Sequence, residues 1–187
     1  MFRYVLLLIL LAAPVAAETV RLGDRTYRID LPARPADAPL IVRCMRGGSA
    51  DQFARNSALS RPANRQGYAV VYPEGTGRAA TWNGGYCCGM AARRGVDDMA
   101  FLDAVIADAV AWFGLDGGRV YLTGMSNGAI MAETYAALRP GRVRAVAGVR
   151  GRWTRGATRP PRRCRCCIST ARRMPWCPMT AARGTAA

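Results

Sequence analysis

Residues 119–128 read Arg-Val-Tyr-Leu-Thr-Gly-Met-Ser-Asn-Gly. The apolar run Val120-Tyr121-Leu122 predicts a buried strand, and the residues from Asn127 to Leu138 have the pattern of a helix. Between them, Gly124-Met125-Ser126-Asn127-Gly128 matches G-x-S-x-G, the strand–turn–helix motif called the nucleophile elbow. Its small residues permit a tight, strained turn that lifts the Ser126 hydroxyl above the carboxyl edge of a sheet. The backbone N–H of Asn127, at the start of the helix, then faces a developing oxyanion.

Strand and helix patterns alternate along the rest of the chain body. Thr19–Leu31 alternates apolar and polar residues around Gly23-Asp24, which predicts a β-hairpin. Short apolar runs predict buried strands at Leu40–Val42, Ala69–Tyr72 and Ala145–Val149. Ser49 is placed to cap a helix that runs towards Gln66, and Val96–Phe113 has helical spacing with Asp97 and Asp98 in its first turn. This alternation predicts an α/β domain with a mainly parallel sheet and helices on both faces.

Several further motifs accompany the elbow. They are Gly48-Ser49-Ala50-Asp51, Val71-Tyr72-Pro73-Glu74-Gly75, Thr81-Trp82-Asn83-Gly84-Gly85-Tyr86-Cys87-Cys88-Gly89 and Gly95-Val96-Asp97-Asp98. Together with residues 119–128 they closely resemble the secreted poly(3-hydroxybutyrate) depolymerase and feruloyl-esterase-like family of α/β-hydrolases, over about Leu40 to Val149. The resemblance implies an α/β-hydrolase fold that is incomplete at its C-terminal end.

The same resemblance implies a secreted serine carboxyl-esterase. Ser126 would be acylated by a polyester such as polyhydroxybutyrate, or by a feruloyl or acetyl ester, and water would then hydrolyse the acyl-enzyme. The Asn127 N–H would be one oxyanion donor, and the Arg43–Gly48 loop would supply the second. This chemistry needs no metal and no organic cofactor. By the same resemblance, Trp82 and the Cys87-Cys88 pair belong to a loop beside the active-site cleft.

The residues of that loop also have structural interpretations. Cys87 and Cys88 in an exported protein are expected to be disulfide halves rather than metal ligands. Adjacent cysteines cannot readily bond to each other without strain, so each is expected to have another partner. Asp97 and Asp98 are expected to cap a helix or form ion pairs rather than act as catalytic acids. Trp82 either shapes the substrate cleft or covers the edge of the sheet.

The general base that a catalytic serine needs is missing from the composition. The chain has 187 residues and no His, and all 27 of its basic residues are Arg. A His base, a His metal ligand and a Ser-Lys pair within this chain are therefore excluded, and Arg stays protonated. We expect the chain as written to be inactive or nearly so as an esterase.

The N-terminus predicts an export signal. Arg3 provides a positive n-region, Val5–Ala13 an apolar h-region, and Val15-Ala16-Ala17 a small-residue cleavage site before Glu18. The apolar run is short for a membrane span, so no span is expected after cleavage of residues 1–17. We expect an extracellular or periplasmic location, in which disulfides are allowed. A partial α/β-hydrolase domain at residues 18–149 is expected to follow.

Residues 150–187 have a different composition from the body. They hold ten Arg and no acid, which is +10 of the net charge of +15, together with Cys164, Cys166, Cys167 and Cys177. Members of the family continue here with His-Gly-Thr-x-Asp-x-x-Val-Pro-Tyr, which carries a triad Asp, and later with a triad His. They also follow the first core strand with Leu-His-Gly, where this chain has Arg43-Cys44-Met45-Arg46.

A shift of reading frame explains both departures. Read from the third base of the Cys166 codon with suitable synonymous codons, residues 167–180 can become Leu-His-Phe-His-Gly-Thr-Ala-Asp-Ala-Met-Val-Pro-Tyr-Asp. Cys44-Met45, shifted in the same way, gives Leu-His. We therefore interpret a short stretch near Arg43–Arg46, and everything after about Val149, as out of frame. On this hypothesis residues 150–187 are not a folded domain.

Other interpretations of this tail stay open. An Arg-rich segment without acids could bind nucleic acid or an anionic surface through phosphate contacts. Its four cysteines could bind zinc, although C-x-C-C-x9-C is not a usual zinc spacing. The isoelectric point of 10.7 mostly describes this one segment, so it is weak support for a nucleic-acid partner. The alternative function is a non-catalytic secreted binding protein, or a protein whose basic tail binds nucleic acid or an anionic surface.

Overall fold

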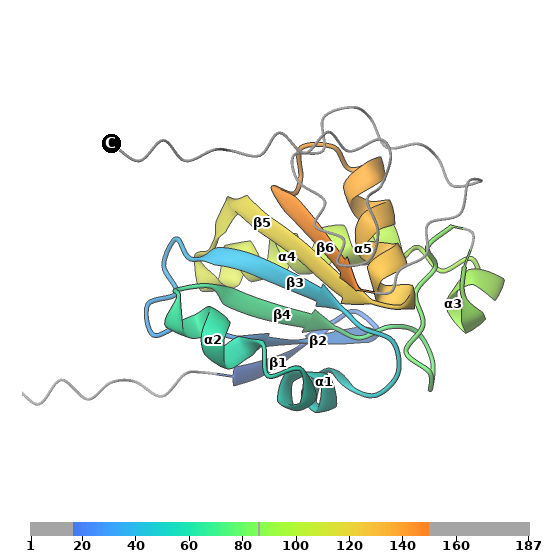
Figure 1. The fold of residues 1–187 in the computed structure, drawn as a ribbon, viewed down its shortest axis with the longest axis horizontal. Helices are drawn as coiled ribbons and strands as arrows, with labels where there is room; N and C mark the ends of the chain where they lie inside the picture. The colour runs from blue at the N-terminus through green and yellow to red at the C-terminus, as the bar shows by residue number, and fades with distance from the viewer. Residues whose placement is uncertain (1–16, 86, 150–187) are drawn as a thin grey trace, which may run out of the picture.

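Six strands form one sheet in the spatial order β1-β2-β4-β3-β5-β6 (Figure 1). The computed structural model describes residues 17–85 and 87–149, so residues 1–16 of the expected leader and the whole Arg/Cys-rich tail lie outside the described residues. The strands are β1 (Ala17–Leu22), β2 (Arg25–Asp30), β3 (Pro39–Cys44), β4 (Ala69–Pro73), β5 (Asp116–Met125) and β6 (Ala145–Val149). Each strand predicted from the sequence is present.

The central part of the sheet is parallel. Strands β4, β3, β5 and β6 pair in parallel, and the β1–β2 hairpin joins β4 in the antiparallel direction. The hairpin turn lies at Gly23-Asp24, as predicted. The carboxyl ends of parallel strands meet at one edge of a sheet, where ligands of α/β proteins bind. The arrowheads of β3, β4 and β5 point to this edge, on the side of α3 and the start of α5 (Figure 1).

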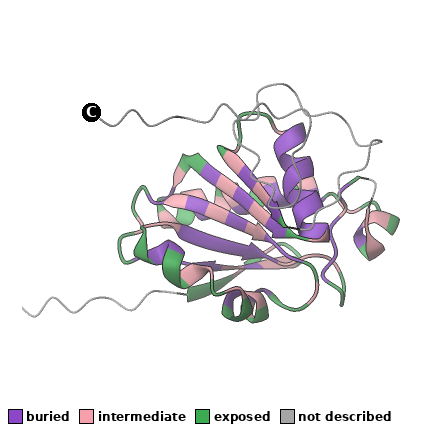
Figure 2. Ribbon diagram, viewed as in Figure 1, coloured by how far each residue is buried: buried purple, intermediate pink, exposed green. Residues whose placement is uncertain are grey.

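Helices cover both faces of the sheet. They are α1 (Ala50–Ser57), α2 (Ser60–Arg65), α3 (Gly89–Arg93), α4 (Asp98–Phe113) and α5 (Asn127–Leu138). Helices α4 and α5 share the larger core with side chains of the central strands such as Val42 and Leu122, and α1 and α2 share a smaller core with Val70 and Tyr72. Figure 2 shows the buried residues concentrated in the strands and in α5. No helix within the described ranges is long and apolar enough to cross a membrane.

The observed helices differ from the predicted ones in three places. The helix after Ser49 is broken in two, because Ala58 has a left-handed backbone with φ 48° and ends α1. Helix α4 begins at Asp98, so Asp97 is its N-cap, accepting a hydrogen bond from the Ala100 N–H at 2.9 Å, and only Asp98 lies in the first turn. The short helix α3 lies in the glycine-rich segment that the sequence predicts only as a loop.

Strand β6 is an edge strand among the described elements. It pairs with β5 alone, and its sequence, Ala-Val-Ala-Gly-Val, has no charged or polar side chain. An edge strand presents unpaired N–H and C=O groups, which can template pairing with another chain. The apolar character of β6 adds to this tendency, since Val149 is 39% exposed at its end.

We expect the chain to self-associate through this edge. Because a lysine blunts an edge strand, Val149→Lys should raise the monomer fraction measured by size-exclusion chromatography with light scattering. Leu138→Lys is the matched control, since Leu138 has a similar exposed fraction of 43% but lies on α5. A wild-type chain that is monomeric and melts cooperatively would contradict this expectation.

Candidate active site

The turn between β5 and α5 has the tight, strained backbone that the sequence predicts. Ser126 stands between the last residue of β5 and the first residue of α5, with φ 55° and ψ −123°. A residue with a side chain is rarely found at positive φ, and such strain accompanies nucleophile elbows. The Ser126 N–H donates to the Val149 carbonyl at 2.9 Å, and the Ser126 carbonyl accepts from the Ala129 N–H at 3.0 Å. These bonds fix the half-buried serine at the carboxyl edge of the sheet.

Two glycines of the motif allow the backbone to close tightly. A Cβ atom on Gly124 would overlap the carbonyl group of Gly128, so the turn itself requires a glycine. A Cβ atom on Gly128 would overlap the carbonyl group of Cys44, the last residue of β3. The first turn of α5 therefore lies directly against the end of β3. Met125, between the first glycine and the serine, is 40% exposed.

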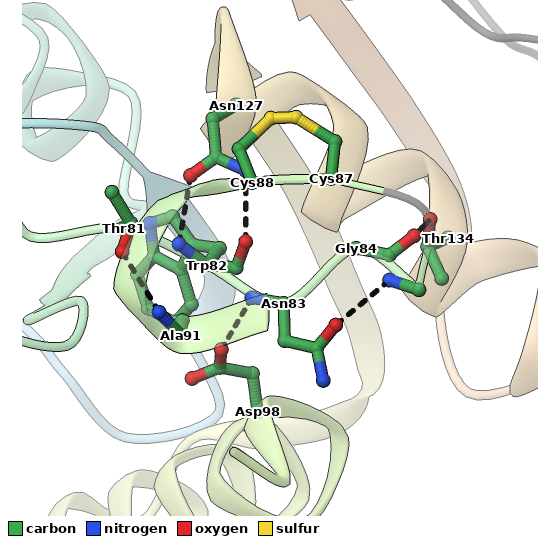
Figure 3. The surroundings of a disulfide bond; sticks show 11 residues. Thr81, Trp82, Asn83, Gly84, Cys87, Cys88, Ala91, Asp98, Asn127 and Thr134 are labelled. Carbon is green, nitrogen blue, oxygen red and sulfur yellow. Dashed lines mark hydrogen bonds between the residues drawn. A yellow bond between two sulfur atoms is a disulfide. The ribbon is translucent and has the colours of Figure 1, made fainter. Parts of the chain in front are cut away.

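The side chain of Asn127 joins the elbow to the loop that contains Trp82. Its Oδ1 accepts a hydrogen bond from the Trp82 N–H at 2.7 Å, and its Nδ2 donates to the Trp82 carbonyl at 2.9 Å (Figure 3). Asn127 is 2% exposed, so both bonds are shielded from water. The sequence analysis used only the backbone N–H of Asn127. Its carboxamide has a second, structural role that the motif does not reveal.

Trp82 is a core residue and does not line a cleft. It is fully buried, and its ring stacks with that of Phe101 at a centroid distance of 6.4 Å. The indole Nε1–H donates to the Met45 carbonyl at 2.7 Å, which satisfies the one polar group of the side chain. Of the two interpretations left open by the sequence, a cleft residue or a cover for the sheet, the burial of the ring and this bond favour the structural one.

The Cys87–Cys88 pair is joined by a disulfide. The structure pairs the two cysteines with each other, whereas the sequence analysis expected each to have another partner. The loop folds back here, since the Gly84 N–H donates to the Cys87 carbonyl at 2.6 Å and the Cys88 N–H donates to the Trp82 carbonyl at 3.2 Å. The third cysteine of the described residues, Cys44, is buried in β3 and unpaired.

Asp97 and Asp98 have the structural roles that the sequence predicts. Asp97 caps α4, and the Asp98 carboxylate is fully buried beside Arg25, whose Nη1 donates to Oδ1 at 2.6 Å. The other oxygen of Asp98 accepts from the Asn83 N–H at 2.6 Å. Asp98 therefore anchors the Trp82 loop to α4.

The first turn of α5 and the Met45 backbone meet beside Ser126, where the sequence predicts an oxyanion hole. The first N–H groups of a helix have no acceptor within it, and Asn127 is the first residue of α5. In this motif the second donor comes from the loop after the third strand. The structure brings Met45 of the Arg43–Gly48 loop beside the elbow, since a Cβ on Gly128 would lie 2.9 Å from the Met45 nitrogen.

None of the residues that the structure describes is a His or a Lys, the side chains that commonly act as a base for a serine. The Ser126 side chain forms no capping hydrogen bond with the backbone of α5. The described residues also contain no cluster of three His, Cys, Asp or Glu side chains that could hold a metal ion.

Glu133 is a buried carboxyl group on the elbow helix that the sequence analysis missed. It is 9% exposed, and its Oε2 has no hydrogen-bond partner among the described residues. Burial raises its pKa to about 7. A Cβ atom on Gly148 would overlap the carboxyl group, so Glu133 lies against β6. The signal in the sequence is one acid within the apolar run Ala129–Leu138.

Residues 26–158 match the family described as Esterase PHB depolymerase. The chain belongs to this esterase family. The match begins in β2 and ends within the Arg-rich tail, so it is longer than the resemblance over Leu40–Val149. Feruloyl esterase B of Talaromyces stipitatus is 28% identical to this chain over 120 residues, which are 63% of this chain and 33% of that protein. The chain spans between 33% and 42% of the length of the curated relatives it matches.

Solved structures of esterases have the same fold as this family member. The acetyl xylan esterase from Aspergillus awamori has a TM-score of 0.60 and 20% identity, covering 72% of this chain and 52% of that chain. The S-formylglutathione hydrolase from Agrobacterium tumefaciens has a TM-score of 0.58 and 16% identity, covering 71% of this chain and 56% of that chain. These similarities confirm the α/β-hydrolase fold.

Gly128→Ala should destabilise the protein, because the new methyl group must displace the end of β3. Overpacking of this kind lowers the free energy of unfolding by about 1–3 kcal/mol, which urea unfolding measures. Gly117→Ala is the control, since its Cβ would lie 3.5 Å from the nearest atom, on Val110. Equal unfolding midpoints for the two variants would show that α5 does not lie against β3 as described.

Glu133 should make the stability depend on pH. Its pKa is about 7 when folded and 4.5 as an ordinary value, so the folded state binds the proton more tightly. The stabilisation is complete below about pH 4.5 and is lost as the pH rises through about 7. Thermal unfolding should therefore show a higher Tm near pH 5 than near pH 8.

Glu133→Gln should remove this contribution to the pH dependence, because a carboxamide does not titrate in this range. Glu18→Gln, on the exposed strand β1, should keep the wild-type profile. A Glu133→Gln protein with the wild-type pH profile would show that Glu133 is not buried as described.

Proposed function

We propose that the chain descends from a secreted serine ester hydrolase and keeps its nucleophile elbow, with Ser126 as the nucleophile. The proposal rests on the elbow, because the strained Ser126, the N-terminus of α5 and the end of β3 lie next to one another. The Ser126 oxygen would attack the ester carbonyl, and the N–H groups of Asn127 and Met45 would hold the oxyanion. The alcohol would leave, and water would then release the acid from the acyl-enzyme.

The relatives and the surface beside the serine support a proposal for the substrate class. The family is named for polyhydroxybutyrate depolymerases, and the relatives include a feruloyl esterase and an acetyl xylan esterase. Met125 and Val149 face each other in the register of β5 and β6, and both are exposed next to Ser126. An apolar acyl group would pack on these two side chains. We propose a polyester such as polyhydroxybutyrate, or a feruloyl or acetyl ester, as the ancestral substrate.

Turnover by the present chain should be very slow. A serine hydroxyl is a weak nucleophile at neutral pH until a base takes its proton, and the chain has neither His nor Lys. Arg stays protonated and cannot serve as that base. We propose that a loss of reading frame after about Val149 and near Arg43–Arg46 removed the base. The DNA sequence tests this directly, because the family's Asp segment must appear in the alternative frame.

An esterase assay separates a weak enzyme from a non-catalytic binding protein. Enzymes that lose members of a catalytic triad keep roughly 10³–10⁴-fold rate enhancement over water, and we expect less here because the oxyanion loop is altered. On a short p-nitrophenyl ester, the wild type and Ser126→Ala should therefore differ little, and an intact family member should be faster by several orders of magnitude. A kcat in the usual enzyme range of about 1–10³ s⁻¹, abolished by Ser126→Ala, would reveal a base that the chain still possesses.

A further inference from the structure

One half of a sheet face is left without a helix among the elements that the structure describes. Helix α5 packs on one face of the sheet, against β3, β5 and β6, and α4 packs on the same face. Helices α1 and α2 pack on the opposite face, against β2 and β4. On that opposite face, β5, β6 and the adjoining part of β3 are therefore bare. A parallel sheet usually has both of its faces covered by helices.

The register of the strands identifies the side chains of this bare half. Ile41 is paired with Tyr121, Arg43 with Thr123, and Thr123 with Ala147, and paired residues point to the same face of a sheet. Ile41 packs against the core of α1 and α2, which determines the face. All five residues are half-buried, and the residues between them are buried on the other face, as the alternating bands along β3 and β5 in Figure 2 show. We call this surface the bare face and define it by Ile41, Arg43, Tyr121, Thr123, Ala145 and Ala147.

The bare face has the dimensions of one helix. Neighbouring strands lie about 4.8 Å apart, so β3, β5 and β6 together span about 10 Å. An α-helix with its side chains is about 10–12 Å wide. Strand β6 has five residues, which extend over about 17 Å. About 11 residues of a helix, or three turns, cover this length.

Arg43 places a cation on the bare face. Its Nε is enclosed and has no hydrogen-bond partner among the described residues. Burial lowers the pKa of Arg43, and neither of the groups that counteract this, Tyr72 and Cys44, is a carboxylate. Tyr72 also contacts α1 and α2, since its hydroxyl lies 3.1 Å from that of Ser57 and 2.9 Å from that of Ser60. Arg43 therefore lies at the border between the bare face and these two helices, with no acid of the described residues to neutralise it.

Arginines of α1 and α2 extend the positive charge along this border. Arg55, Arg61 and Arg65 are exposed. Helix α2 contains no acid, and the one acid of α1, Asp51, is bound to Arg28 at 2.7 Å. Arg61 and Arg65 are four residues apart on α2, a spacing at which like charges repel each other. The flank of the bare face is therefore positively charged.

We propose that the bare face binds an acidic amphipathic helix of another protein. The apolar side chains of that helix would pack on Ile41, Tyr121 and Ala147, and its carboxylates would bind Arg43 and the arginines of α1 and α2. Residues 150–187 of the chain itself do not have this chemistry, because they hold ten Arg and no acid. A second copy of the chain would bring two identical sets of arginines together, and these would repel. This binding goes beyond the proposed ester hydrolysis, because it requires no reaction at the elbow.

The test is the binding of a fluorescein-labelled peptide to the full chain, measured by fluorescence anisotropy. The peptide has about 15 residues, with Leu on one face of the helix and Glu on the other, because shorter isolated helices are marginal in water. Arg43→Gln should weaken binding roughly tenfold, since it removes a half-buried ion pair. Arg34→Gln is the matched control and should bind like the wild type, because Arg34 is exposed in the loop between β2 and β3, outside the bare face.

Two further variants test the apolar contact and the flank separately. Tyr121→Ala should weaken binding roughly tenfold, because it removes the largest apolar side chain of the bare face. The double variant Arg61→Gln/Arg65→Gln should weaken binding about fivefold and reduce its dependence on salt, as expected for exposed ion pairs. Circular dichroism melts verify that the variants are folded, and the double variant on the surface of α2 tests the proposal even if Arg43→Gln does not fold.

Each contrary outcome is distinguishable. A peptide of the same composition in scrambled order, which has no apolar face, should bind at least tenfold more weakly. Equal binding of the scrambled peptide would show that charge alone attracts it and would overturn the proposal. Equal affinities of the Arg43→Gln and Arg34→Gln variants, or a preference for a peptide with Lys in place of Glu, would also overturn it. Ser126→Ala should bind like the wild type, and loss of binding in that variant would place the peptide at the elbow instead.

Discussion

The contact between the first turn of α5 and the end of β3 determines the geometry of the whole candidate site. Gly128 leaves room for only backbone between the helix and the Cys44 carbonyl. Asn127 then binds the backbone of Trp82, and the Trp82 indole binds the Met45 carbonyl. The strand end, the loop and the elbow are thereby connected in one buried hydrogen-bonded unit. This unit fixes Ser126 and its neighbouring N–H groups relative to one another.

The members of this unit contribute to stability whether or not the chain catalyses a reaction. They are backbone groups, a carboxamide and an indole, none of which changes charge during an ester hydrolysis. Their role in stability is the satisfaction of buried polar groups, and leaving one of these unpaired costs roughly 1–3 kcal/mol. The base of a serine hydrolase, in contrast, contributes proton transfer. A chain can therefore lack the base and still fold its elbow.

The fold was largely predictable from the sequence, because its signals are local. Apolar runs defined the strands, helical spacing defined α4 and α5, and the elbow motif fixed the order of β5 and α5. The break at Ala58 was not predictable, since alanine carries no preference for a left-handed backbone.

The side-chain arrangement of the site depended on contacts between distant segments. The sequence left the role of Trp82 open between a cleft residue and a cover for the sheet, because its acceptor, the Met45 carbonyl, is 37 residues away in sequence. The carboxamide role of Asn127 and the burial of Glu133 likewise arise only when α5 packs on the sheet.

The reactivity of Ser126 towards a fluorophosphonate probe, followed by intact mass and peptide mapping, tests whether the elbow lacks a base. Such probes modify serines whose proton is removed by a neighbouring group, and they do not depend on the choice of ester. We predict that Ser126 is modified no faster than other exposed serines of the chain. Rapid, stoichiometric modification at Ser126 alone would contradict this and show that the serine is activated.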